Sequence, residues 1–496
     1  MLLLGIDVGT SSIKVSVVDS DTQSAVVSAQ FPETESEIKS LKAGWAEQSP
    51  DMWWEHVEQA ILKAHSTGKY QPKEIGAIGI AYQMHGLVLV DQNLKALRDS
   101  IIWCDSRAVG IGERAFHEIG EERSLSRLLN SPGNFTASKL AWVKENEPEI
   151  FEQIFKVMLP GDYIAMKLTG EITVSASSLS EGILWDFRED TISADVLKCF
   201  GFSRELFPEV RPVFSEHGHV TGEVAERLGL KAGIPVTYKS GDQPNNALSL
   251  NVLQPGEVAA TAGTSGVIYG VSDTLFYDPQ SRVNTFAHVN YTTGAKRLGV
   301  LLCINGTGSL NRWIKNNLAG GLSYKEIDTR GKRIPVGAEG LRILPFGNGA
   351  ERMLNNKMPG AHILNIDLNN HTGDHIFRAE QEGIAFAFRY GLDIMRENGM
   401  HPSVIRVGKA NLFQSPLFAE AFVNATNVPV ELYNNDGSVG AAIGAGIGVK
   451  VFVSERDAFA NQKPIQLIAP DQPEIYQEIY EDWKSLLLNQ LERKSI

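Results

Sequence analysis

The sequence predicts an α/β protein built from two similar halves that face each other. Residues 2–19 and residues 258–273 share one pattern: an apolar strand, a Gly-Thr-Ser turn and a second β-rich strand. A glycine-containing turn between two apolar runs indicates a β-hairpin, and its recurrence about half a chain later indicates a duplication. Between the two hairpins, strand-like runs alternate with helix-like runs, which is typical of α/β proteins.

Individual elements can be placed along the chain. Residues 52–65 predict an amphipathic helix, because Ser49 is a favoured N-cap and Pro50 suits the first helical position. The other elements are predicted from two patterns: short apolar runs indicate strands, and longer runs with helical periodicity indicate helices. Strands are expected at residues 75–81, 87–90, 234–238 and 405–407, and helices at residues 379–397, 415–426 and 476–494.

A domain boundary is expected at residues 239–246, between the two repeated hairpins. It divides the chain into an N-terminal domain of residues 1–241 and a C-terminal domain of residues 242–496. The last helix is a candidate for packing back on the N-terminal domain.

Charge and cysteine usage exclude several classes of protein. The formal net charge of −13 repels nucleic acid and anionic membranes. Cys104, Cys199 and Cys303 are widely spaced, which is typical of reduced thiols. An apolar strand begins within residues 1–5, without a signal-peptide pattern, and the glycine-rich run at 439–453 is too short to span a bilayer. The sequence therefore predicts a soluble cytoplasmic protein that binds neither nucleic acid nor membrane.

The turn of the first hairpin has residues suited to phosphate and metal binding. Gly9 lets backbone N–H groups approach a phosphate closely, and Thr10 and Ser11 add hydroxyl donors. Asp7, at the end of the strand, can hold Mg²⁺ directly or through water. An ordinary hairpin with an aspartate near its turn is the alternative interpretation.

The second hairpin repeats the turn as Gly263, Thr264 and Ser265. Two facing hairpins could clamp a triphosphate from both sides, because phosphoryl transfer needs mainly positioning and charge stabilisation. Neither hairpin has the GxxxxGK[ST] form of a P-loop, and no GxGxxG fingerprint occurs. Only the pair, taken together, favours a nucleotide site.

Asp242 follows Gly241 and the strand expected at residues 234–238. A carboxylate at the carboxyl end of such a strand projects into the crevice of an α/β sheet. It can accept the proton of an attacking hydroxyl, the role that kinases give to aspartate. The alternative is that Asp242 only caps a helix beginning at Gln243.

Two loops carry residues suited to binding a polyol. Gln83, Met84 and His85 lie between two expected strands, and an imidazole can donate or accept hydrogen bonds. Trp103 and Asp105 follow another apolar run and combine an aromatic face with a polar group. Each of these residue types, taken by itself, more often has a purely structural role.

Four glycines recur at helical spacing: Gly437, Gly440, Gly444 and Gly448. They could let a nucleotide base approach the backbone, or they could trim a helix face for close packing. The sequence leaves both interpretations open.

Together these motifs resemble the FGGY family of carbohydrate kinases over nearly the whole chain. The family's phosphate motif stands as GIDVGTSSIKV, and its Trp-x-Glu-Gln-x-Pro segment begins at Trp45. The Gln-Met-His-Gly segment ending at Gly86 is similar to that of the xylulokinase branch. Further matches follow at residues 136–143, 159–163, 168–171, 241–242 and 263–266. The resemblance implies the duplicated actin-like, ribonuclease-H-like fold, with two domains around a central cleft.

The resemblance also implies an activity: ATP- and Mg²⁺-dependent phosphorylation of a ketopentose, foremost D-xylulose to D-xylulose 5-phosphate. Asp242 would be the general base, and Asp7 and Asp242 would hold the metal. The residues expected to bind the sugar are Gln83, Met84, His85, Trp103, Asp105 and Asp242. Those expected to bind ATP are Thr10, Ser11, Lys14, Gly263, Thr264, Ser265, Gly408, Lys409 and Asn411. The expected partners are thus a sugar and ATP, and a homodimer is the assembly that many relatives adopt.

Three positions depart from the family patterns. Asn134 and Asn365 replace residues expected in the two family signatures. Lys409 stands where the adenosine motif usually has a second glycine. This last departure bears on nucleotide preference more than on kinase activity.

Two alternative functions remain at the level of sequence. One is a kinase of the same family for L-xylulose, ribulose, fuculose, gluconate, glycerol or a sugar alcohol, because a few hydrogen bonds decide stereochemistry. The other is an actin- or chaperone-like nucleotide switch without sugar chemistry. The polar loop at residues 83–86 argues against the switch.

Overall fold

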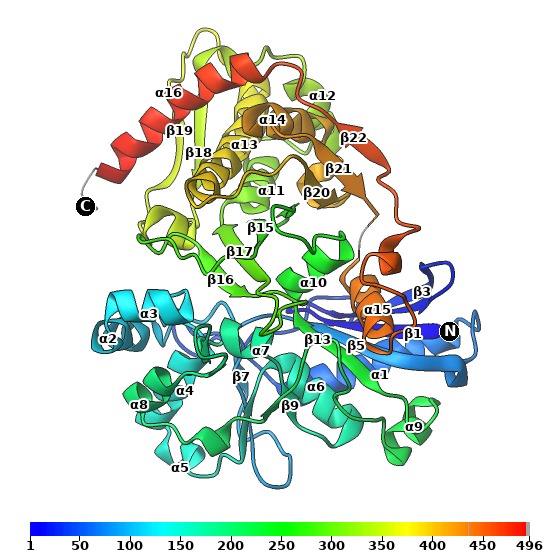
Figure 1. Ribbon diagram of the computed structural model, residues 1–496. Coiled ribbons are helices and arrows are strands. Elements are labelled where there is room, and N and C mark those ends of the chain that lie inside the picture. Colours follow the sequence, from blue (N-terminus) through cyan, green and yellow to red (C-terminus); the bar gives the residue numbers. More distant parts are fainter. Residues whose placement is uncertain (435, 493–496) are drawn as a thin grey trace.

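Each half of the chain is built around one central mixed sheet (Figure 1). The computed structural model describes residues 1–434 and 436–492. The N-terminal sheet has the strand order β13-β5-β1-β2-β3, and the C-terminal sheet the order β16-β17-β15-β14-β20-β21-β22. The N-terminal strands are β1 (Leu2–Val8), β2 (Ile13–Asp19), β3 (Ser24–Phe31), β5 (Ile75–Tyr82) and β13 (Val236–Gly241). The C-terminal strands are β14 (Val258–Ala262), β15 (Gly266–Ser272), β16 (Asn284–Ala287), β17 (Leu298–Ile304), β20 (Ile405–Gly408), β21 (Val430–Tyr433) and β22 (Gln466–Ile468).

The two sheets share one topology, which confirms the duplication predicted from the repeated hairpin. The first strand of each hairpin, β1 or β14, pairs antiparallel with the next strand, β2 or β15. It also pairs in parallel with a later strand, β5 or β20, which pairs in parallel with β13 or β21. A further antiparallel strand, β3 or β17, flanks each hairpin. Strands β16 and β22 extend the C-terminal sheet beyond this shared plan.

Helices cover both faces of the N-terminal sheet, which explains why its central strands β1 and β5 are almost continuously apolar. Helix α1 (Pro50–Ser66) packs on β2 and β3, and Ser49 caps it by accepting a hydrogen bond from the Met52 N–H, as predicted. The other helices of this half are α2 (Val109–Ile119), α3 (Glu121–Leu128), α4 (Thr136–Asn146), α5 (Pro148–Phe151), α6 (Pro160–Thr169), α7 (Ala176–Glu181), α8 (Ala194–Phe200) and α9 (Gly222–Leu228).

The helices of the C-terminal half are α10 (Asp242–Ser249), α11 (Thr307–Asn317), α12 (Tyr324–Gly331), α13 (Gly373–Glu397), α14 (Pro416–Thr426), α15 (Gly437–Gly448) and α16 (Pro473–Glu492). The helix predicted at residues 379–397 is confirmed as α13 but begins earlier, at Gly373, because Thr372 and His375 form a capping box there.

Helix α15 belongs to the second half of the sequence but packs on the N-terminal sheet, against β1, β2, β5 and β13 (Figure 1). Its glycines permit this close approach. A Cβ on Gly444 would lie 2.6 Å from the Tyr238 ring, and one on Gly448 would lie 2.1 Å from the Thr237 carbonyl oxygen. The close-packing interpretation of the glycine series is therefore confirmed on this face of the helix.

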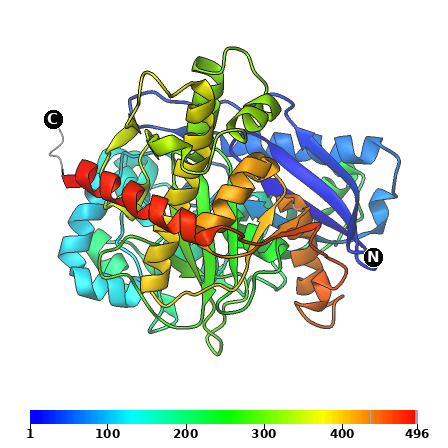
Figure 2. The ribbon, with the colours of Figure 1, turned by 90° about the horizontal axis from the view of Figure 1, so that it is seen from above.

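The last helix, α16, lies across the C-terminal domain (Figure 2). It contacts α13, α14 and the strand β18 (Arg342–Phe346), which pairs with β19 (Gly360–Leu364). Tyr476, Tyr480 and Trp483 pack their buried rings around Phe386 of α13. This apolar contact holds the helix on its own domain, in place of the expected packing on the N-terminal domain. None of the described helices is long and apolar enough to cross a membrane.

Candidate functional site

Three of the predicted site residues stand at neighbouring strand ends. Strands β13, β5 and β1 are adjacent and parallel, so their carboxyl ends share one edge of the sheet. Asp7 lies near the end of β1, Gln83 follows β5 and Asp242 follows β13. The fold thus brings together the first hairpin, the loop at residues 83–86 and the carboxylate predicted to be the base.

Asp7 lies close enough to Asp242 for its charge to affect the ionisation of Asp242. Burial and the Asp7 charge raise the pKa of Asp242 to about 7. Burial and the Asp436 charge raise the pKa of Asp7 to about 6. Both side chains keep a partial opening to solvent, although protein surrounds them closely. Neighbouring carboxylates repel one another, so this corner of the cleft favours a bound cation.

The arrangement fits Mg²⁺ bound together with a nucleotide. Among the described residues, no cluster of three or more His, Cys, Asp or Glu side chains could hold a metal by itself. Magnesium is usually held by one or two carboxylates plus waters and substrate phosphates, so a complete protein cage is not needed. Asp7 and Asp242 are neighbouring carboxylates that could take this role.

Asp242 is the first residue of α10, and Gly241 occupies the N-cap position without a side-chain hydrogen bond. The alternative interpretation of Asp242 as a helix N-cap is therefore not supported. Gly241 is needed here because a Cβ would lie 2.6 Å from Cγ of Met84 and 3.1 Å from Oε1 of Glu181. Met84, predicted to contact the sugar, and Glu181 thus border the Asp242 backbone.

Gln83 links the loop at residues 83–86 to the first hairpin. Its Oε1 accepts a hydrogen bond from Oγ1 of Thr10 at 3.2 Å, and its Nε2 donates to Oε1 of Gln48 at 3.0 Å. Gln48 in turn donates to the Thr10 carbonyl at 2.8 Å. Nε1 of Trp103 also donates to Oγ1 of Thr10, at 2.9 Å. Thr10 therefore connects residues predicted to bind the sugar with the turn predicted to bind phosphate.

Several contacts hold the backbone and the ring of His85. Its backbone N–H donates to Oε2 of Glu181 at 2.8 Å, and its ring Nδ1 lies 3.0 Å from the backbone carbonyl oxygen of Glu181. Its ring meets Phe135 edge-on and also packs near Phe286. Burial and the nearby Lys139 charge lower the pKa of His85 to about 3, so the ring is neutral at physiological pH.

Trp103 and Asp105 differ in how open they are. The Trp103 side chain is 44% exposed, whereas Asp105 is 1% exposed. The Asp105 carboxylate accepts hydrogen bonds from the Ala46 N–H at 2.6 Å and from Arg107 at 2.7 Å. The Asp105 carboxylate is thus engaged by protein groups, and its position suits support of the loop better than direct contact with a sugar.

Two buried residues at the site received no role from the sequence. Nζ of Lys139 donates to the carbonyl oxygens of His85 at 2.8 Å and Ile102 at 2.9 Å, and burial lowers its pKa to about 7. Glu181 ends the short helix α7 and contacts His85. Lys139 lies within the matched family signature at residues 136–143, whereas a glutamate after a run of small residues was the only local signal for Glu181.

The second hairpin is anchored to the start of α11. The Gly263 carbonyl accepts hydrogen bonds from the Gly308 N–H at 2.9 Å and from Oγ1 of Thr307 at 3.0 Å. A Cβ on Gly263 would lie 3.4 Å from Nδ2 of Asn411, so these two predicted ATP-binding residues are neighbours. The Thr264 side chain is exposed.

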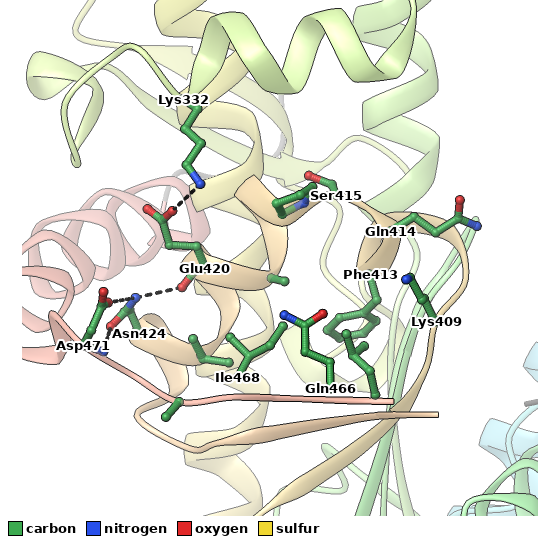
Figure 3. Close-up of a pocket in the computed structure, with 15 residues that line it drawn as sticks. Lys332, Lys409, Phe413, Gln414, Ser415, Glu420, Asn424, Gln466, Ile468 and Asp471 are labelled. Atoms are coloured by element: carbon green, nitrogen blue, oxygen red, sulfur yellow. Dashed lines mark hydrogen bonds and ion pairs between the residues drawn. The ribbon is translucent and has the colours of Figure 1, made fainter. Parts of the chain in front are cut away.

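The remaining predicted ATP-binding residues are more scattered. The Lys409 N–H donates to the Tyr433 carbonyl at 2.8 Å. The Lys409 side chain is exposed and lines a cavity of about 300 Å³ between α14 and β22, beside Gln414 (Figure 3). Lys14 is exposed and forms a loose ion pair with Asp436 at 3.9 Å. Lys409 and Asn411 therefore face different surroundings, although only one residue separates them.

Comparison with known proteins establishes the family. Residues 2–249 match the N-terminal domain of the FGGY family of carbohydrate kinases, and residues 258–449 match its C-terminal domain. The chain belongs to this family. It is therefore a carbohydrate kinase with the actin-like fold, and ATP is the phosphate donor of such kinases.

Several relatives cover most of the chain. The xylulose kinase of Escherichia coli (strain K12) is 30% identical over 447 residues, which span 90% of this chain and 88% of the relative. That of Bacillus subtilis (strain 168) is 29% identical over 462 residues, 91% of this chain and 89% of the relative. The crystal structure of xylulose kinase from Rhodospirillum rubrum matches 99% of this chain and 100% of its own, with a TM-score of 0.89 and 27% identity.

Proposed function

We propose that this FGGY kinase transfers phosphate from ATP to a ketopentose, with D-xylulose as its preferred substrate and Asp242 as the base. The placement of Asp242 carries the proposal, because it lies beside the first hairpin and the loop at residues 83–86. Its pKa of about 7 also suits a base working near neutral pH. The xylulose kinases among its relatives support the choice of sugar.

In this mechanism Asp242 accepts the proton of the sugar hydroxyl as that oxygen attacks the γ-phosphorus of ATP, and the bond from this phosphorus to the bridging oxygen breaks to release ADP. Thr10 and the Gly263 turn would position the phosphates from opposite halves of the protein. Mg²⁺ held by Asp7 and Asp242 would neutralise charge on the phosphates. Closure of the two domains would exclude water and so limit wasteful hydrolysis of ATP.

Release of ADP, measured across a sugar panel, tests the substrate. The panel contains D-xylulose, L-xylulose, D-ribulose, gluconate and glycerol. We expect kcat/KM for D-xylulose to exceed the others by at least about tenfold, or about 1.4 kcal/mol in transition-state binding. A smaller preference would contradict the choice of substrate, and a protein that no sugar stimulates would favour the nucleotide-switch alternative.

The variant Asp242→Asn tests the base. Its turnover should fall by about 1,000-fold or more with normal folding, because the amide cannot accept the hydroxyl proton. Asp436→Asn is a matched control, since Asp436 caps α15 and asparagine caps equally well. The control should lose far less activity, and near-normal turnover by Asp242→Asn would exclude Asp242 as the base.

A further inference from the structure

Helix α7 lies where the two domains are joined by hydrogen bonds next to the candidate site. Oγ of Ser177 donates to the Ala287 carbonyl at 2.8 Å, and the Ala287 N–H donates to Oγ of Ser180 at 2.8 Å. Ala287 belongs to β16, the edge strand of the C-terminal sheet, which lies directly above α7 in Figure 1. The last residue of α7, Glu181, is thereby held relative to both domains.

The Glu181 side chain is 1% exposed. Its carboxyl group is hydrogen-bonded to the loop at residues 83–86 and to the end of β5, both next to the candidate site. Its Oε2 accepts the His85 N–H at 2.8 Å, and its Oε1 accepts the Tyr82 hydroxyl at 2.9 Å. Burial raises the pKa of Glu181 well above its usual range. A carboxyl group that stays protonated still provides two acceptor oxygens, so it can make both bonds.

His85 needs such support because its backbone is in the left-handed region, with φ of 62°. This conformation is unfavourable for residues other than glycine and persists only when neighbours hold it. Glu181 holds the N–H of His85, and Lys139 holds its carbonyl oxygen. Both ends of the strained residue are therefore fixed by buried side chains.

The same contacts determine which nitrogen of the His85 ring carries the proton. The Glu181 carbonyl oxygen can only accept a hydrogen bond, so Nδ1 of His85, 3.0 Å away, must donate. The ring is neutral near pH 7, so its Nε2 then has a free lone pair. None of the described residues bonds to this Nε2, and the His85 side chain keeps 17% of its surface exposed.

We propose that Glu181 is a positioning residue that fixes His85 as a hydrogen-bond acceptor beside Asp242, so that the substrate presents a hydroxyl group to Nε2 of His85. The inference rests on the proposed sugar kinase activity and deepens it. A carbonyl oxygen at that point of the substrate would face a lone pair and be rejected. Glu181 also borders Gly241, so one buried side chain sets the spacing between His85 and the base.

Two variants of similar size separate positioning from mere packing. Glu181→Gln retains an acceptor for the His85 N–H, whereas Glu181→Met fills the space without one. We expect Glu181→Gln to stay within about threefold of the wild-type kcat/KM for D-xylulose. Glu181→Met should raise the KM for D-xylulose by about tenfold or more and leave the KM for ATP unchanged. Equal kinetics of the two variants, both shown to be folded by circular dichroism, would overturn the proposal.

A spectroscopic measurement covers the case in which Glu181→Met does not fold. The full-length protein is labelled with ¹⁵N-histidine, and the His85 signals are identified by their loss in His85→Gln. The ¹⁵N shifts should show a neutral ring protonated on Nδ1 from about pH 6 to about pH 9. A ring protonated on Nε2, or on both nitrogens, would overturn the proposal. Wild-type protein that phosphorylates no sugar would instead refute the proposed function, which the ADP assay detects independently of the His85 spectrum.

Discussion

The hairpins β1–β2 and β14–β15 occupy equivalent places in the duplicated sheets but differ in chemistry. Asp7 lies two residues before Gly9 in the first turn, whereas Thr261 lies two residues before Gly263 in the second. The Thr10 side chain is bonded to Gln83 and Trp103, whereas that of Thr264 is exposed. The duplication thus supplies two turns predicted to bind phosphate, and only the first adds a carboxylate and a link to the predicted sugar loop.

Among substitutions in the two hairpins, the largest effect should come from removing the acidic residue that distinguishes the first hairpin. Asp7→Asn should lower kcat/KM by about 100-fold or more, because the Mg²⁺ that Asp7 would hold contributes several kcal/mol to charge stabilisation in phosphoryl transfer. Steady-state kinetics at saturating Mg²⁺ measures the loss. Thr261→Ala, at the equivalent place in the second hairpin, is the control. Similar losses in both variants would contradict the asymmetry between the hairpins.

The pH profile gives a second view of the acidic hairpin. Asp242 accepts a proton only when ionised, so kcat/KM should rise with pH through about 7 and fall to about a tenth of its plateau near pH 6. The Asp7 charge raises the pKa of Asp242, so Asp7→Asn should move the inflection of the remaining activity to lower pH. Added Mg²⁺ should shift the wild-type inflection in the same direction. A flat wild-type profile at low Mg²⁺ would argue against Asp242 as the base.

The two threonines of the hairpin turns should differ in which substrate they affect. Thr10→Val removes hydrogen bonds to Gln83 and Trp103, so it should raise the KM for both D-xylulose and ATP by up to about tenfold. Thr264→Val should raise only the KM for ATP. Separate titrations of the two substrates measure this difference. A raised KM for D-xylulose in Thr264→Val would contradict the predicted difference between the two threonines.

Lys409→Gly should have the smallest effect. The Lys409 side chain lines the cavity between α14 and β22, whereas Asn411 lies beside Gly263. Restoring the usual glycine should therefore change the KM for ATP by less than about threefold, within the range of one surface contact. A rise of tenfold or more, with the KM for sugar unchanged, would assign Lys409 to nucleotide binding after all.

Local sequence signals were sufficient for the elements whose pattern is set within a few residues. The glycine turns and apolar runs predicted both hairpins, and Ser49 and Pro50 predicted the start of α1. The recurring motif was enough to predict the duplicated fold, without knowledge of how the strands pair. The same reasoning located Asp242, because the end of a buried strand can be recognised from its own residues.

Contacts between segments that are far apart in the sequence could not be predicted from these local signals. Glu181 acts on His85 from 96 residues away, and α15 joins the N-terminal sheet from the other half of the chain. Asp105 was predicted to bind the sugar, yet its carboxylate accepts hydrogen bonds from Arg107 and from the Ala46 N–H.

The amino-acid sequence by itself determined the two hairpins and the α/β alternation, and it placed Asp7 and Asp242, the carboxylates predicted to act in catalysis, at the ends of strands. Only the tertiary structure decided which buried groups hold the His85 ring, where the last helix packs and which way Lys409 faces. The physical reason is that turns and strands depend on neighbours along the chain, whereas burial, pKa and the direction of a hydrogen bond depend on neighbours in space.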